Sequence, residues 1–489
     1  MELSMHDRNL AHAGRPCSGA RFRVLTVVAA VAVAALAAGC TSPPPYEPPA
    51  VSTPAAFKEG GNWALANPNA AEVPDAWWTM FDDPVLTQLQ ERVVVDNENL
   101  KASLAQYRIA QAALASSRST LFPTVGAAAG ATRSANGSNL NSSANSIYSV
   151  TASASWEVDL WGRLSRGVDA AQARLEASRD DLAAATLSVR ATLAISYFSL
   201  RATEEQIALL ERSLAAFQRS LDLTQNRYRA GVASAADVAQ AQTQLKSTQA
   251  QLIEANSSRA QLEHAIAVLV GKAPADFALD KGASLPRAPE VPLQLPSELL
   301  QRRPDIAAAE RRVAAANSQI GVAQAAFFPA LTLSASAGLR GSSLSDLINS
   351  PARVWSLGPQ LALALFDAGA RRAAVDSARA NADLAAANYR QTVLTAFQEV
   401  EDNLILGSNL RQEAEVQREA LDAAQRALEI VNNQYQSGIV SYLNVITAQT
   451  TALAAERTLL DVRSRRLAAL AQLLKNIAGR WDVEPVASK

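Results

Sequence analysis

This sequence of 489 residues has few cysteines, histidines and aromatic residues, and its net charge is close to zero. It contains 2 cysteines and 3 histidines, aromatic residues make up 5%, and the formal net charge is -1. A balanced charge shows no bias towards nucleic acid, so we expect no nucleic-acid partner. Hydrophobic residues make up 49% of the chain, but many of them are alanine. This composition favours closely packed long helices over a core of bulky side chains.

The N-terminus has the three parts of a secretion signal. Arg15, Arg21 and Arg23 precede an apolar run at 24–38, which ends in the letters LAAGC at 36–40. The run is too short for a membrane-spanning helix. A cysteine after Ala-Ala-Gly resembles the bacterial lipoprotein signal, although Ala37 stands where leucine is commonest. We therefore predict that residues 1–39 are a signal peptide and that Cys40 is acylated. The alternative is a plain secretory signal with an incidental cysteine.

Removal of that signal peptide would leave few residues for chemistry. Cys40 and His264 would then be the only cysteine and histidine. They cannot form a disulfide framework, a His/Cys metal cluster or a Cys–His pair. A serine hydrolase would depend on His264, and no G-x-S-x-G sequence surrounds a serine. We therefore expect no enzyme, no metal and no cofactor other than the lipid on Cys40. His264 is interpreted as an ordinary helix residue.

One phrase of seventeen residues occurs twice in the chain. It is RYRAGVASAADVAQAQT at 227–243 and QYQSGIVSYLNVITAQT at 434–450, with seven identical positions. Among the identical pairs are Tyr228 and Tyr435, Gly231 and Gly438, Ser234 and Ser441, and Val238 and Val445. The repetition indicates a duplicated unit.

The local chemistry of each copy predicts a tight turn between two helices. A helical pattern ends at Gly231 and at Gly438, as suits the left-handed residue just past a helix C-terminus. Three residues later, Ser234 and Ser441 can accept hydrogen bonds from the first amides of a new helix. The capping-box positions are then held by Asp237 and Asn444.

Four segments of about ten residues are expected to form strands, two in each half of the chain. They lie in LFPTVGAAAGATRSA (121–135), YSVTASASWEVD (148–159), FFPALTLSASAGLR (327–340) and VWSLGPQLALALFDAG (354–369). Apolar side chains such as Val150, Leu333 and Leu363 alternate with polar ones such as Ser153 and Ser334. This length suits a tilted strand crossing a bilayer, although a soluble sheet would also alternate.

Four strands cannot close a barrel around a channel, and open sheet edges are not tolerated in lipid. Several copies of the chain must therefore pool their strands. Three copies would contribute twelve strands, a number within the range of known barrels.

Long helices are predicted between the strands and the repeated turns. They cover roughly 163–229 and 371–436, and at about 1.5 Å per residue each spans on the order of 100 Å. A second helix returns from each turn, and a further helical stretch begins near Pro84 and continues to about Arg118. The predicted domains are a tether at 40–83, a first repeat at 84–271, a Pro-rich linker at 272–296, a second repeat at 297–479 and a tail at 480–489.

Three motifs carry a resemblance to a known family. WWTMFDDPVL (77–86), LPSELLQRRPDIAAAERRVAAANSQIGVAQAAFFPALTL (295–333) and WSLGPQLALALFDAG (355–369) resemble the outer-membrane factors of tripartite efflux pumps. The chain is most similar to the NodT-type lipoprotein subfamily of TolC-like proteins. The resemblance implies a mainly α fold and a homotrimer. Its twelve-stranded barrel in the outer membrane would continue as a helical tunnel through the periplasm.

The resemblance also implies partners at the turns. A periplasmic adaptor protein would contact the tips through Tyr228, Gly231, Ser234, Gly438 and Ser441. It would connect the duct to an inner-membrane pump, usually of the resistance–nodulation–division type. Trp77 and Trp78 are interpreted as residues that pack the tether against the helices, and Pro304 as the start of a helix.

Gate residues are carried over position by position. Asp237 and Tyr435 match the family's constriction, whereas the acids of the second repeat correspond to Asn444 and Thr447, and a nearby arginine corresponds to Val440. With these charges absent, the resemblance implies a hydrophobic and hydrogen-bonded gate formed by Tyr435, Val440 and Asn444. Asp237 is either part of this gate or only a helix cap.

The predicted function is a passive exit duct for drugs or other small molecules. No P-loop is present, so energy would come from the partner pump. One alternative is a duct for secreted proteins with an ATP-driven partner. Another is a coiled-coil structural lipoprotein without a pore.

Overall fold

The computed structural model describes residues 46–62, 75–135, 144–282, 284–291, 303–349 and 351–477. The chain divides into a short unit, Met1–Glu47, and a large unit, Pro48–Lys489, which contains every element discussed below. The predicted signal peptide, Cys40 and the tail at 480–489 lie outside the described residues.

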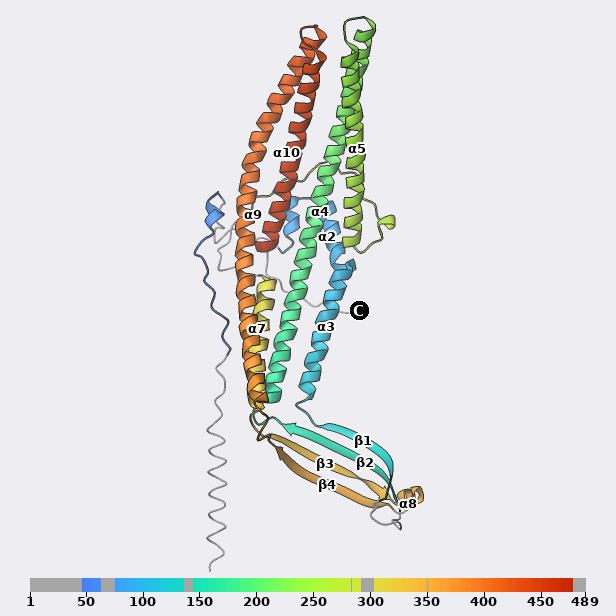
Figure 1. The fold of residues 1–489 in the computed structure, drawn as a ribbon, viewed down its shortest axis with the longest axis vertical. Coiled ribbons are helices and arrows are strands. Elements are labelled where there is room, and N and C mark those ends of the chain that lie inside the picture. The colour runs from blue at the N-terminus through green and yellow to red at the C-terminus, as the bar shows by residue number, and fades with distance from the viewer. Residues whose placement is uncertain are drawn as a thin grey trace, which may run out of the picture. The chain divides into compact units, whose positions relative to one another are not determined.

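Long antiparallel helices make up most of the large unit (Figure 1). The first repeat contributes α4 and α5, and the second contributes α7, α9 and α10. Their bounds are Arg163–Arg229, Ala235–Leu269, Pro304–Ala325, Ala370–Gln436 and Tyr442–Ile477. The predicted long helices are confirmed, and Pro304 occupies the first turn of α7 as predicted. α4 packs against α5 and α7, and α9 packs against α10 and α7.

The predicted helix from Pro84 to Arg118 is interrupted, which corrects the sequence analysis. α2 covers Pro84–Asp96 and α3 covers Glu98–Ser119, with Asn97 between them in an extended conformation. The Asn97 side chain accepts a hydrogen bond from the Leu100 amide at 3.0 Å and donates one to the Leu269 carbonyl at 2.7 Å. Asparagine competes with the helix for backbone partners, so it ends one helix and caps the next.

Four antiparallel strands form one sheet in the order β1-β2-β3-β4. The strands cover Thr124–Ser134, Asn145–Val158, Ala330–Gly341 and Ala352–Ala362. The register places Val150 between Ala129 and Leu339, and Ser153 between Gly126 and Ser336. One face of the sheet is therefore mainly apolar and the other carries mainly serine, threonine and glycine, which confirms the predicted alternation.

Two details of the strands differ from the prediction. β4 ends at Ala362, so Leu363 follows the strand rather than belonging to it. The second hairpin loop contains the short helix α8, Leu344–Asn349, which the sequence analysis does not predict. Local alternation extends past Ala362, but strand bounds depend on hydrogen bonds to a neighbour, which end there.

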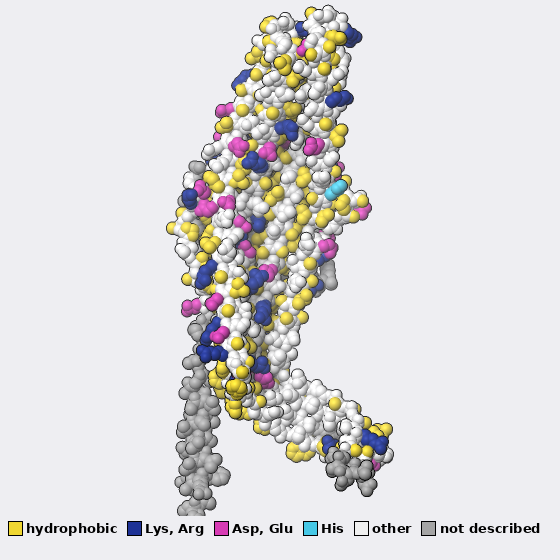
Figure 2. All heavy atoms as spheres, viewed as in Figure 1, with side chains coloured by type: hydrophobic (Ala, Val, Ile, Leu, Met, Phe, Trp, Pro, Cys, Tyr) yellow, Lys and Arg dark blue, Asp and Glu magenta, His cyan; other side chains and the backbone are white. Residues whose placement is uncertain are grey.

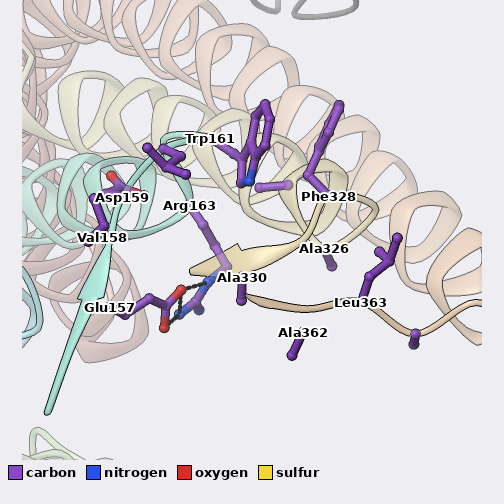
Figure 3. Close-up of a pocket in the computed structure, with 13 residues that line it drawn as sticks. Glu157, Val158, Asp159, Trp161, Arg163, Ala326, Phe328, Ala330, Ala362 and Leu363 are labelled. Carbon is purple, nitrogen blue, oxygen red and sulfur yellow. Dashed lines mark hydrogen bonds and ion pairs between the residues drawn. The ribbon is translucent and has the colours of Figure 1, made fainter. Parts of the chain in front are cut away.

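A small cavity of about 170 Å³ lies where the sheet meets the helices (Figure 3). Arg163, the first residue of α4, pairs with both carboxylate oxygens of Glu157 at the end of β2. The Trp161 indole stacks on Phe328 with ring centroids 4.8 Å apart and donates to the Pro329 carbonyl at 2.7 Å. The Arg163–Glu157 ion pair, the Trp161 hydrogen bond and the aromatic stack thus set the direction in which the helices leave the strands.

The main hydrophobic core lies midway along the helices. Trp77 and Trp78 are buried in the same cluster as Phe198, and the Arg190 guanidinium lies 4.4 Å from the Trp78 ring centroid. The prediction that these tryptophans pack the N-terminal segment against the helices is confirmed. Aromatic rings supply the bulk that the surrounding alanine helices lack.

The described part of the linker between the repeats is held by buried charges. Glu204 accepts hydrogen bonds from Arg201 at 2.6 Å, from Arg259 at 2.9 Å and from the Gly282 amide at 2.9 Å. A Cβ atom at Gly282 would lie 2.3 Å from the Arg201 side chain. The linker therefore packs so closely against these ion pairs that position 282 has no room for a side chain.

Candidate functional site: the paired helix tips

The first tip has the hydrogen bonds of a Schellman motif. Gly231 has a φ of 77°, in the left-handed region. Its amide donates to the Tyr228 carbonyl at 2.9 Å, and the Val232 amide donates to the Arg227 carbonyl at 2.9 Å. These two bonds satisfy carbonyl groups at the end of α4 that would otherwise lack partners.

The second tip repeats this geometry. Gly438 has a φ of 76°, its amide donates to the Tyr435 carbonyl at 3.0 Å, and the Ile439 amide donates to the Gln434 carbonyl at 2.9 Å. The predicted turns and the structural duplication are therefore confirmed (Figure 1).

The helix that follows each turn begins differently in the two copies. Ser234 Oγ accepts from the Asp237 amide at 3.1 Å, and the Asp237 carboxylate accepts from the Ser234 amide at 2.9 Å, which is a full capping box. In the second copy the Asn444 amide donates to the main-chain carbonyl of Ser441 at 3.2 Å. The predicted side-chain cap is thus found at Ser234, and the bond found at Ser441 is to the main chain.

Tyr435 connects the two tips. Its side chain is buried, and its ring lies under the Arg227 guanidinium at 4.7 Å from the ring centroid. Arg227 also donates to the Tyr435 carbonyl at 2.8 Å, and Thr224 Oγ1 lies 3.3 Å from the Tyr435 hydroxyl. The end of α4 in the first repeat therefore holds the end of α9 in the second.

A second tyrosine extends this contact into α10. Tyr442 lies with its ring centroid 5.5 Å from that of Tyr435, and its hydroxyl accepts from Ser220 at 3.1 Å. Burial raises the pKa of Tyr442 above its ordinary value, and the hydrogen bond from Ser220 opposes this shift. The Tyr442 hydroxyl is thus a neutral hydrogen-bonding group at neutral pH.

The predicted gate residues occupy both tips, and their role in a gate stays a prediction. Tyr435 and Val440 belong to one apolar cluster near the tips, whereas Asp237 is half-buried at the start of α5 and Asn444 is exposed at the start of α10. The Asp237 carboxylate accepts its hydrogen bonds from Ser234. In this arrangement Asp237 is a helix cap.

Sequence reasoning missed Arg227, Thr224 and Ser220. Their contacts join segments more than two hundred positions apart, so no local pattern indicates them. One signal was available: the repeated phrase has Arg227 in the first copy and Gln434 at the matching position. Among the residues that the structure describes, no group of His, Cys, Asp and Glu side chains is placed to hold a metal ion.

Similar proteins were found by family, by sequence and by structure. The family model described as outer membrane efflux protein matches residues 89–272 and 295–479. The probable efflux pump outer membrane protein TtgC of Pseudomonas putida is 32% identical over 457 residues, which cover 91% of this chain and 93% of that protein. The solved structure of the outer-membrane channel OprN has a TM-score of 0.84 at 30% identity, covering 90% of this chain and 100% of that one.

A further solved structure, the open state of the outer membrane channel MtrE of Neisseria gonorrhoeae, has a TM-score of 0.79 at 31% identity. It covers 90% of this chain and 98% of that chain. These matches agree with the duplicated helical hairpins, the two-faced sheet and the twin turns described above. Because the family model spans well over half of its residues, the chain belongs to the outer membrane efflux protein family.

Proposed function

We propose that three copies of this chain form the outer-membrane channel of a tripartite efflux system. The duct is passive and carries drugs or other small molecules from an inner-membrane pump. The observation that carries this proposal is the two-faced sheet joined directly to helices of 67 residues. Its apolar face suits lipid and its Ser-rich face suits a water-filled lumen.

Trimer formation follows from the sheet edges. β1 and β4 each have a neighbour on one side only within the chain, and unpaired edges are not stable in lipid. α3 leads into β1, and β4 leads into α9, so each sheet edge continues into one helix. Both helices expose apolar side chains, among them Ile109, Leu384 and Leu394. In the trimer, β1 and α3 of one copy pack against β4 and α9 of the next.

The tips are the proposed contact surface for a periplasmic adaptor protein. Four apolar side chains are exposed there: Tyr228, Val232, Ile439 and Leu443. They surround the turns of Gly231 and Gly438 and the helix starts at Ser234 and Ser441. An adaptor that covers these side chains would connect the duct to a pump, which we expect to be of the resistance–nodulation–division type.

Conductance in planar bilayers tests the channel. We expect purified trimers to give stepwise ion currents, because a lumen lined by Ser153 and Ser334 side chains holds water. A coiled-coil lipoprotein without a pore would give no current. Deletion of the gene should increase susceptibility to small toxic compounds, whereas a duct for proteins would change the secreted proteins instead.

The gate is proposed to be the contact between the two tips. Opening would separate α9 from α4, and the Arg227–Tyr435 hydrogen bond and ring contact would then break. A hydrogen bond to a charged group contributes about 1.5–3 kcal/mol, so its loss favours opening. Arg227→Gln should therefore raise the basal conductance, whereas Arg229→Gln, at an exposed position two residues later, should not.

Asp237→Ala distinguishes a gate acid from a helix cap. The capping box predicts a cost of about 1 kcal/mol in local stability. If the acid also holds the tip closed, basal conductance rises as it does in Arg227→Gln. Unchanged conductance would leave Asp237 as a cap alone.

We propose the lipid anchor on Cys40 because the tether is long enough to bring this residue to the membrane. The amides of Lys58 and Glu59 donate to the Glu401 carboxylate at 2.8 and 3.0 Å, which holds the tether on α9. The eighteen residues from Cys40 to Lys58 extend to at most about 60 Å. The helical rise from Ala370, next to the strands, to Glu401 is about 45 Å. Cys40 can therefore reach the level of the membrane.

A further inference from the structure

The end of the sheet farthest from the helices carries an excess of positive charge. Arg133 in β1, Arg340 in β3 and Arg353 in β4 are all exposed there, and none makes an ion pair within the described residues. Asp346 is the one acid in the second hairpin loop, and its carboxylate accepts from Ser342 at 2.6 Å. Figure 2 shows basic and hydrophobic side chains gathered at this end.

The three arginines lie on different faces of the sheet. Side chains alternate along a strand, so Arg133 shares a face with Val125, and Arg353 shares a face with Trp355. That is the apolar face, because the register aligns Arg353 with Leu339 and Val150. Arg340 lies on the opposite face with Ser334 and Ser336.

α8 adds apolar side chains to the same face. Gly341 ends β3 in register with Tyr148 of the apolar row. A Cβ atom at Gly341 would lie 2.6 Å from the Leu347 amide nitrogen, so α8 crosses over that face. Leu344 and Ile348 are one helical turn apart and remain 59% and 73% exposed. Trp355 is 79% exposed.

We propose that this rim binds a phosphorylated glycolipid of the outer leaflet of the outer membrane. Arg133 and Arg353 would bind its phosphate groups, because guanidinium matches phosphate in two parallel hydrogen bonds. Leu344, Ile348 and Trp355 would contact its acyl chains near the interface, where tryptophan is enriched. The inference rests on the proposed function, since it requires the apolar face to meet lipid.

The test compares two variants of the full-length trimer in detergent. The double variant Arg133→Gln/Arg353→Gln removes both charges on the apolar face, and Arg340→Gln removes one from the opposite face at a similar height. Binding of diphosphorylated lipid A is measured through the thermal shift it causes. With about 1 kcal/mol per arginine near an anionic surface, the double variant should bind roughly thirtyfold more weakly. Arg340→Gln should bind like the parent.

Three outcomes would overturn the proposal. Equal binding of dephosphorylated lipid A would show that phosphate is not recognised. Equal protection by inorganic pyrophosphate would show an ion site rather than a lipid site. Equal loss in Arg340→Gln would show that the face does not matter. A parent protein that gives no current in bilayers without lipid A would instead contradict the proposed channel. Failure of the lipid proposal and failure of the channel proposal are therefore distinguishable.

Discussion

Gly231 and Gly438 have φ angles of 77° and 76°, although 207 positions separate them in the chain. A side chain at Gly231 would meet no atom within 4 Å, so space is not what requires glycine there. The left-handed backbone is the requirement, because a Cβ atom in that conformation approaches the carbonyl oxygen. The identity of these two residues is therefore a consequence of local geometry.

This geometry predicts the effect of substitution at the tips. Gly231→Val should cost about 1–2 kcal/mol locally, because positive φ is most unfavourable for a β-branched residue. We expect trimers that insert normally and lose efflux, because the adaptor surface is distorted far from the strands. Drug susceptibility and the yield of membrane trimers are the measurements.

Gly231→Asn is the matched control for this prediction, since asparagine tolerates the left-handed region. It should keep most of the efflux, and so should Gly438→Asn. An asparagine variant as defective as the valine variant would mean that the turn needs the absence of a side chain rather than a backbone conformation.

At the scale of the element, the strands have two chemically distinct faces. Val150→Arg or Leu333→Arg should impair barrel assembly by roughly 2–4 kcal/mol near mid-bilayer. The same change at Ser153 or Ser334 should be tolerated, because those side chains face the lumen in the proposed trimer. The yield of heat-resistant trimers measures assembly. Equal damage on both faces would contradict a lipid-facing row.

The start of α7 should make stability depend on pH. Asp305 accepts two hydrogen bonds from Arg303, which also pairs with Glu399 at 2.9 Å. Burial raises the pKa of Asp305, but the hydrogen bond and charge of Arg303 outweigh burial, and the pKa is lowered. A carboxyl group with a lowered folded-state pKa stabilises the fold above its unfolded pKa, about 3.9, and that stability is lost as pH falls.

Asp305→Asn should therefore lower the unfolding temperature at pH 7 and make its decrease towards pH 3 shallower. Asp376→Asn is the control, because Asp376 and Arg379 form an exposed pair at 3.8 Å that contributes little. Parallel pH profiles for the parent and Asp305→Asn would show that this pair does not stabilise the folded chain. Thermal unfolding followed by circular dichroism gives both profiles.

At the scale of the whole molecule, the proposed trimer would contact the membrane in two ways, through its barrel and through the proposed lipid on Cys40. Cys40→Ser should remove the acyl chains and still allow trimers to form, because the pooled strands supply an independent membrane contact. Labelling with a radioactive fatty acid, followed by gel analysis of trimers, checks both parts. Incorporation that persists in the variant would place the lipid elsewhere.

The sequence by itself determined the local features of this protein. Alternation, helix length, the two turn glycines and the capping box of Ser234 each depend on residues a few positions apart, so a pattern is enough to indicate them. The duplication was visible for the same reason. Even the break at Asn97 has a local cause, although its hydrogen bond to the Leu269 carbonyl involves a distant helix.

Only the tertiary structure decided how distant segments meet. Tyr435 is buried against Arg227 and Thr224, a contact that no local pattern indicates, and the Asp237 carboxylate accepts from the Ser234 amide of its own helix start. Their role in a gate stays a prediction. Leu363 fell outside its strand because no neighbouring strand continues beside it. The position of α8 over the apolar face follows from the close approach at Gly341. Such contacts depend on how α4, α9 and the strands pack across hundreds of residues, and periodicity within one segment carries no information about a partner that distant.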